Sequence, residues 1–235
     1  MSRTTTTASR GTASRGVAAL WRSTVGKKAV MAVSGVALLG FVVAHMIGNL
    51  KVFLGPESID GYGRWLRAIG SALLGNEGVL WVLRIGLVVM IVLHMTAAVQ
   101  LARRARAARP EHYRSRRPVQ GSYAARTMRW GGVIIVLFVV YHLLDLTAGV
   151  LNPHGVHGEI YRNVTADFQL WYVTLAYTVA VLALGLHIRH GIWSALQTLG
   201  VTSARVVQTA ALGFAVVICV GYLSVPFAVL FGLVR

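Results

Sequence analysis

The sequence predicts an all-α integral membrane protein built from a five-helix transmembrane bundle. Hydrophobic residues make up 56% of the 235 residues and charged residues only 13%, against about 25% charged in soluble domains. Five segments are long and apolar enough to cross a bilayer, which takes about 20 residues per helix. Basic residues flank these segments instead of forming one face of a soluble fold, so the net charge of +16 does not indicate nucleic-acid binding.

The five spans belong to one predicted transmembrane domain, over residues 21–235. Residues 1–20 are rich in Thr, Ser, Ala and Arg, which predicts a disordered basic tail. Arg84 and Asp145 are the charges that interrupt the apolar cores of the spans. A short interfacial helix is expected near residues 58–74. The spans are expected at about 29–52, 78–105, 127–151, 167–197 and 203–234.

Loop charges predict the orientation. The segment before the first span carries six basic residues, and the loop between the second and third spans carries nine arginines from Arg103 to Arg129. The loops after the first and third spans hold few basic residues, and acidic residues offset them. Because basic loops stay on the cytoplasmic side, we expect a cytoplasmic N-terminus, an outside C-terminus and a location in the cell inner membrane.

Four of the eight histidines lie deep in apolar spans, one in each of the first four. Ionisable groups inside a membrane are rare and costly, so four in successive helices indicate a function. At about 1.5 Å per residue, two of them fall in the outer half of the bilayer and two in the inner half. The outer pair is His45 with His142, and the inner pair is His94 with His187.

Two imidazoles from different helices at one depth are the axial ligands that a planar haem requires. The four histidines therefore predict two haem b groups, one in each half of the membrane, that carry electrons across it. Zinc suits this pattern poorly because it takes four ligands in one site. The single cysteine, Cys219, excludes an iron–sulfur cluster bound by this chain alone, and we expect it to pack among apolar neighbours.

Polar residues near the histidines are candidates for binding the haem edges. Arg84 lies 10 residues before His94, near the predicted depth of the outer pair. We favour a propionate of the outer haem as its partner, over a salt bridge with Asp145. Glycines near His45 and His187 either make room for a macrocycle or pack helices together. The remaining candidates are Asn49 and Lys51 at the outer haem, and Arg189, His190 and Trp193 at the inner one.

Two segments resemble a known family. The run HMIGNLKVF from His45 to Phe53 and the run HIRHGIWSALQTLG from His187 to Gly200 are similar to the cytochrome b subunit of succinate dehydrogenase and fumarate reductase. The closer likeness is to the single-chain, five-helix, di-haem type, over roughly residues 20–235. The resemblance assigns the same two histidine pairs, and it favours His187 over His190, a competing ligand that spacing alone does not exclude.

The resemblance implies a respiratory enzyme complex. A flavoprotein subunit and an iron–sulfur subunit would bind on the cytoplasmic side, and succinate would be oxidised there. Electrons would pass through the haems to a membrane quinone, for which we expect menaquinone. The chain would then be the membrane subunit of a succinate:quinone oxidoreductase in the respiratory chain and the tricarboxylic acid cycle, without a succinate site or catalytic residues of its own.

Two other functions agree with part of the pattern. The same paired histidines in membrane helices would suit the di-haem cytochrome b subunit of another respiratory oxidoreductase, such as a nitrate reductase or a hydrogenase. A haem-free membrane anchor or a proton-conducting protein would use the histidines for hydrogen bonds between helices. The identity of the soluble partner subunits distinguishes a succinate dehydrogenase subunit from the subunit of another oxidoreductase. The haem content distinguishes it from a haem-free protein.

Overall fold

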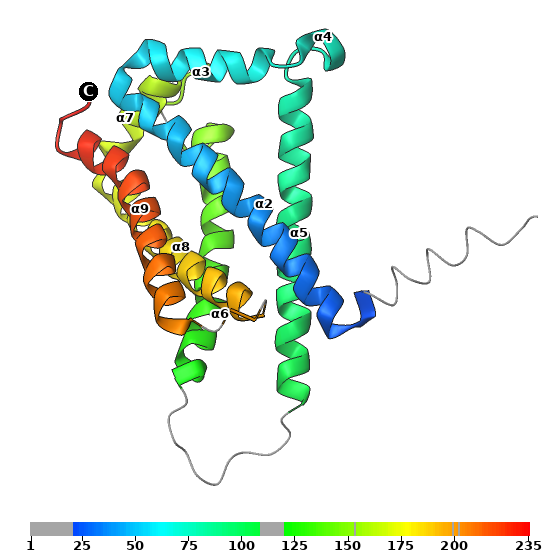
Figure 1. Ribbon diagram of the computed structural model, residues 1–235. Coiled ribbons are helices and arrows are strands. Elements are labelled where there is room, and N and C mark those ends of the chain that lie inside the picture. Colours follow the sequence, from blue (N-terminus) through cyan, green and yellow to red (C-terminus); the bar gives the residue numbers. More distant parts are fainter. Residues whose placement is uncertain (1–20, 109–119, 153, 199, 202) are drawn as a thin grey trace, which may run out of the picture. The chain divides into compact units, whose positions relative to one another are not determined.

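The computed structural model describes residues 21–108, 120–152, 154–198, 200–201 and 203–235 (Figure 1). This part of the chain is helical without a strand, which confirms the all-α fold. It contains the five predicted helices that are long and apolar enough to cross a membrane. The predicted tail at 1–20 and part of the arginine-rich loop lie outside the described residues. The long helices are α2 (Thr24–Leu50), α5 (Gly78–Ala107), α6 (Gln120–His142), α8 (Trp171–Thr198) and α9 (Ala204–Leu230).

The chain divides into two compact units, and both α2 and α5 contribute to each. The first unit contains Met1–Leu38 and Arg84–Arg116, and the second contains Leu39–Leu83 and Arg117–Arg235.

In the first unit, α2 up to Leu38 lies against α5 from Arg84 onward. The Ser23 hydroxyl accepts a hydrogen bond from the Gly26 amide at 2.8 Å, a typical way to begin a helix. Near this end, Arg104 donates hydrogen bonds to the Arg22 carbonyl at 2.6 Å and to the Thr24 hydroxyl at 3.2 Å. These bonds tie the end of α5 to the beginning of α2.

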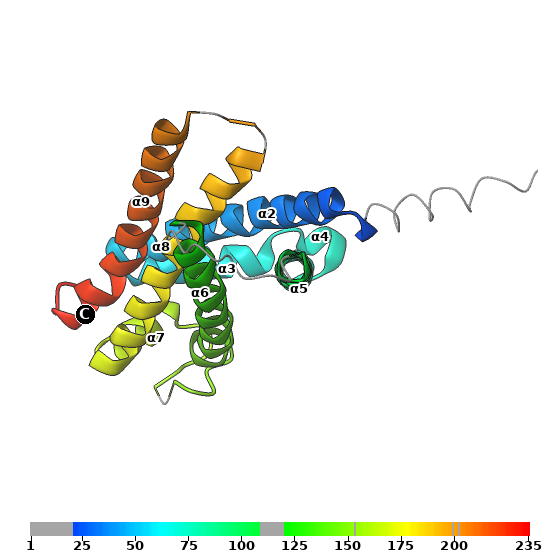
Figure 2. The same cartoon turned by 90° about the horizontal axis from the view of Figure 1, so that it is seen from below.

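In the second unit, α8 packs between α6 and α9 (Figures 1 and 2). A glycine on α8 lets α9 approach closely, because a Cβ atom on Gly185 would overlap the Cys219 sulfur. Cys219 donates to the Val181 carbonyl at 3.6 Å, so this cysteine packs within the α8–α9 contact. A glycine on α9 likewise lets α2 approach closely, because a Cβ atom on Gly221 would overlap the Met46 sulfur.

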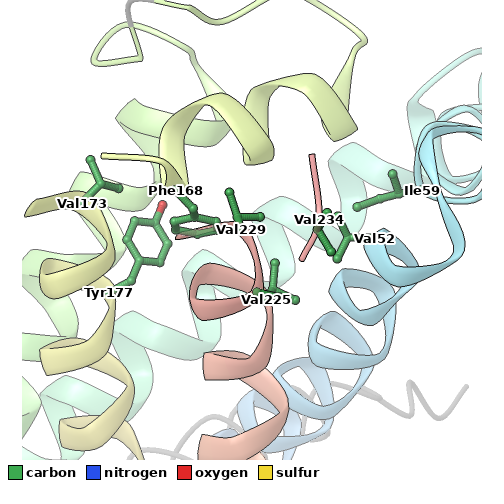
Figure 3. Close-up of a cluster of buried hydrophobic side chains, with 9 residues drawn as sticks. Val52, Ile59, Phe168, Val173, Tyr177, Val225, Val229 and Val234 are labelled. Atoms are coloured by element: carbon green, nitrogen blue, oxygen red, sulfur yellow. The ribbon is translucent and has the colours of Figure 1, made fainter. Parts of the chain in front are cut away.

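Short helices cover one end of this unit. They are η1 (Lys51–Leu54), α3 (Pro56–Ala68), α4 (Ser71–Leu74) and α7 (Ile160–Phe168). The Asp60 carboxylate on α3 accepts a hydrogen bond from the Tyr161 amide at 3.0 Å and so caps the beginning of α7. Under these helices lies a buried apolar cluster that includes Val52, Phe168, Tyr177 and Val229 (Figure 3). We call this region the α3–α7 end.

The third span departs from a regular helix just after His142. Residues Leu143–Thr147 form a π-helical turn, in which the Ala148 amide donates to the Leu143 carbonyl, five residues back, at 2.7 Å. The extra residue in the turn places Asp145 inside the unit, where it is 1% exposed. Such turns are frequent at functional sites because they redirect a side chain without ending the helix.

The fourth span is preceded by a separate helix. A continuous span was expected from residue 167, whereas α7 ends at Phe168 and α8 begins at Trp171. The Thr174 hydroxyl donates to the Phe168 carbonyl at 3.0 Å, which helps to satisfy the end of α7. The break places Asp167 at the carboxyl end of α7, where its side chain is 2% exposed.

Candidate functional site

The structure brings two of the predicted ligands together in the second unit. The ring centroids of His45 on α2 and His142 on α6 lie 5.8 Å apart, with the ring planes at 77°. A metal ion held between two imidazole nitrogens, with bonds of about 2 Å, puts two such centroids roughly 6 Å apart. The two rings therefore fit a pair of axial ligands, although they come from residues 97 positions apart in the sequence.

Hydrogen bonds orient the His142 ring. Its Nδ1 lies 3.1 Å from the Tyr177 hydroxyl, and that hydroxyl lies 3.1 Å from Oδ2 of Asp145. Because the carboxylate is an acceptor, the tyrosine donates to it and accepts from the Nδ1–H of His142. This arrangement fits a haem ligand, since it fixes the tautomer and leaves Nε2 as the atom that would bind iron.

Aromatic rings enclose both histidines. Phe41 stacks on His45 with 5.2 Å between ring centroids, and Phe138 stacks on His142 at 5.9 Å. Tyr222 lies 6.2 Å from His45, and its hydroxyl donates to the Val42 carbonyl at 2.7 Å, which holds the ring in place. The side chains next to both imidazoles are therefore largely aromatic.

The first unit holds His94 in a similar way. Its Nδ1 lies 3.1 Å from the Met31 carbonyl and 3.2 Å from the Ser34 hydroxyl. Because the carbonyl only accepts, Nδ1 carries the proton, so the tautomer again leaves Nε2 as the atom for a metal. A Cβ atom on Gly35 would lie 3.3 Å from this ring, which explains a glycine at that position.

An apolar groove lies beside His94 in the same unit. It has a volume of about 270 Å³ and is lined by Ala29, Val30, Val33, Ser34, Met90 and Leu93. Ser34 is buried, and its hydroxyl donates to the Val30 carbonyl at 2.7 Å. The groove offers apolar surface next to the predicted inner ligand.

The fourth predicted ligand, His187, belongs to the second unit. It lies half-buried on α8, and its ring is near Gly132 of α6, where an added Cβ atom would lie 3.9 Å from it. His190 and Trp193 are also half-buried on α8, whereas Arg189 is exposed. The pairing of His187 with His94, and the choice of His187 over His190, stay predictions.

The structure gives the burial and some contacts of the residues predicted at the haem edges. Lys51 extends over the Tyr62 ring, with 5.6 Å between Nζ and the centroid, and Asn49 is half-buried beside it in the chain. Arg84 is half-buried in the first unit. Their contacts with propionates stay predictions. For the glycines, Gly185 packs against α9 and Gly48 packs against Tyr62, whereas no atom lies near an added Cβ at Gly40 or Gly191.

Sequence reasoning missed two residues of this site. Tyr177 looks like one more aromatic residue of an apolar span, and Asp167 was counted only as a loop charge. Position along α8 could have revealed Tyr177, because it lies 10 residues before His187, or about 15 Å along the helix. That distance places it at the depth of the outer pair. No sequence signal predicts that Asp167 is buried.

We predict that Tyr177→Phe destabilises the protein by about 1–3 kcal/mol, because the buried Asp145 carboxylate loses a donor and His142 loses an acceptor. Thermal unfolding in detergent measures the effect. Tyr172→Phe is the matched control, since Tyr172 lies on the same helix and is 54% exposed. Equal shifts in the two variants would contradict this account of the hydrogen bonds.

The fold defines a multi-pass helical membrane protein, and its paired histidines define a candidate site for a cofactor within it. Comparison with protein-family models, with curated proteins and with solved structures found no match to this chain.

Proposed function

We propose that the chain is the membrane anchor and di-haem cytochrome b subunit of a succinate:quinone oxidoreductase. The observation that carries the proposal is the contact between His45 and His142, together with the hydrogen bond that orients His142. A histidine that only joins two helices needs one such hydrogen bond. A haem with two histidine ligands requires, in addition, a second imidazole close to the first.

The inner haem belongs to the same proposal. His94 and His187 would hold it, and the Met31 carbonyl would keep His94 in the required tautomer. With the N-terminus in the cytoplasm, this haem would face the iron–sulfur subunit. That subunit and the flavoprotein would bind to the cytoplasmic face of the inner membrane.

Haem iron would supply one-electron transfer when bound, and the chain supplies the environment. The four histidines would hold the two haems, with two histidines for each. Arg84, Asn49 and Lys51 would bind the propionates of the outer haem as cations or hydrogen-bond donors. His190, Arg189 and Trp193 would do so at the inner haem, and a membrane quinone, proposed to be menaquinone, would accept the electrons.

Purification of the chain from its native membrane, with its bound partners, tests this function. We expect a flavoprotein and an iron–sulfur protein to accompany it, and we expect succinate to reduce the cytochrome before a quinone analogue reoxidises it. A molybdenum or nickel protein in their place would identify another respiratory oxidoreductase. A complex without a flavoprotein that remains unreduced by succinate would overturn the proposal.

A further inference from the structure

Two buried carboxyl groups lie together at the α3–α7 end. Asp145 comes from the π-helical turn after α6, and Asp167 comes from the carboxyl end of α7. Their exposed fractions are 1% and 2%. Tyr177 lies next to both positions, because its hydroxyl donates to Asp145 and its ring centroid is 4.8 Å from that of Phe168, the residue after Asp167. Two adjacent carboxylates in an apolar surrounding repel each other and lose the solvation of water, so this pair is unfavourable while both are ionised.

One oxygen of the pair lacks a donor. Oδ2 of Asp167 is buried, and no group in the described part of the chain donates a hydrogen bond to it. The Tyr177 hydroxyl already donates to Oδ2 of Asp145. A proton between the two aspartates would supply a hydrogen bond to the Asp167 carboxyl group, whose Oδ2 otherwise lacks one.

The groups that face Asp167 do not offset its charge. Burial is the main cause and the neighbouring Asp145 the second, and together they raise the pKa of Asp167 to about 7. Tyr141 of α6 and Tyr177 of α8 are further titratable groups near the pair, and His142 of α6 lies on the other side of the Tyr177 hydroxyl. On α3, the charged residue that contacts α7 is Asp60, at the opposite end of α7. The carboxyl end of α7 also disfavours a negative charge.

We propose that Asp145 and Asp167 form a proton-binding site, in which a proton carried by Asp167 is hydrogen-bonded to Asp145 and exchanges with water at the α3–α7 end. Proton binding at this site is a property that electron transfer between haems does not itself require. It also explains why Asp167 is buried next to an apolar cluster that contains Phe168, Val225 and Val229.

The position of the site connects it to the candidate haem ligand. Tyr177 contacts both Asp145 and His142, so a proton on the pair lies two hydrogen bonds from the imidazole. This step rests on the proposed function: reduction of the outer haem would raise the fraction of pairs that hold the proton, which is taken from water, and oxidation would release it to water again. A nearby proton stabilises the reduced state, so the midpoint potential of the outer haem would fall as pH rises.

The proton site is tested on the full chain by the pH dependence of thermal unfolding. The folded protein holds the Asp167 proton up to about pH 7, whereas the unfolded chain releases it near pH 4. The melting temperature should therefore fall between about pH 4 and 7, and Asp167→Asn should remove part of that decline. Glu159→Gln, which removes an exposed carboxylate near the beginning of α7, should leave the profile unchanged.

Infrared spectroscopy supplies a readout that is independent of stability and of haem. Wild type near neutral pH should show a protonated-carboxyl band that shifts in heavy water, and Asp167→Asn should lack it. Absence of the band in wild type, together with identical melting profiles for wild type and Asp167→Asn, would overturn the proton site. If the outer haem is present and its potential depends on pH equally in both proteins, the link to electron transfer is wrong. Absence of haem would instead overturn the proposed function and leave the infrared result to decide the proton site.

Discussion

His45→Leu is expected to remove the outer haem completely and to leave the inner haem in place. The leucine keeps an apolar side chain of similar volume beside Phe41 and Tyr222, so the surrounding helices retain their packing. The iron, however, loses one of its two proposed protein ligands, and His142 alone remains on the other face of the site. A difference spectrum of reduced against oxidised protein, with extraction of the haem, measures the change as half of the wild-type content.

His94→Leu is the matched variant for the other layer. It should remove the inner haem and leave the outer one, so the two variants should lose spectrally different components. Loss of the same component from both proteins would contradict the assignment of His45 and His94 to different haems. His190→Leu tests the choice of ligand on α8, because it should weaken binding of the inner haem without abolishing it if His187 is the ligand.

Gly185→Leu is expected to be the most destabilising substitution in the contact between α8 and α9. A Cβ atom at this position would overlap the Cys219 sulfur and approach the Ala215 carbonyl, so the two helices must separate to admit a larger side chain. Overpacking of this kind costs about 1–3 kcal/mol and occasionally more. Thermal unfolding in detergent, or resistance to a chemical denaturant, measures the loss.

Gly213→Leu is the control for Gly185→Leu. Gly213 lies exposed on α9, and no atom lies within 4 Å of a Cβ atom built there, so the larger side chain should be accepted. The double variant Gly185→Leu with Cys219→Gly should recover part of the lost stability, because the smaller residue vacates the space. Equal stability of the two leucine variants would contradict close packing at Gly185.

The sequence analysis predicted the five long helices because an apolar run of sufficient length determines a membrane span without help from its neighbours. The depth of His45 and His142 was predictable for the same reason, since a helix converts residue number directly into distance. The contact between their rings agrees with that depth. The ligand role of the four histidines stays a prediction.

The surroundings of the histidines depend on tertiary structure and were not predictable in the same way. The π-helical turn that buries Asp145 leaves no pattern in an apolar run, and α7 joins α8 through a break of two residues. Burial of Asp167 results from the packing of α7 against α3, α8 and α9. The sequence left two explanations for the glycines, and the neighbours of Gly35, Gly48 and Gly185 indicate packing at those positions.

The haem content of the purified wild-type chain tests the central claim most directly. Cells supplied with haem should yield a protein with close to two haem b groups per chain, and its reduced spectrum should be that of low-spin iron with two histidine ligands. A folded, membrane-extracted chain that contains no haem would contradict the claim, because the paired histidines would then serve only to join helices.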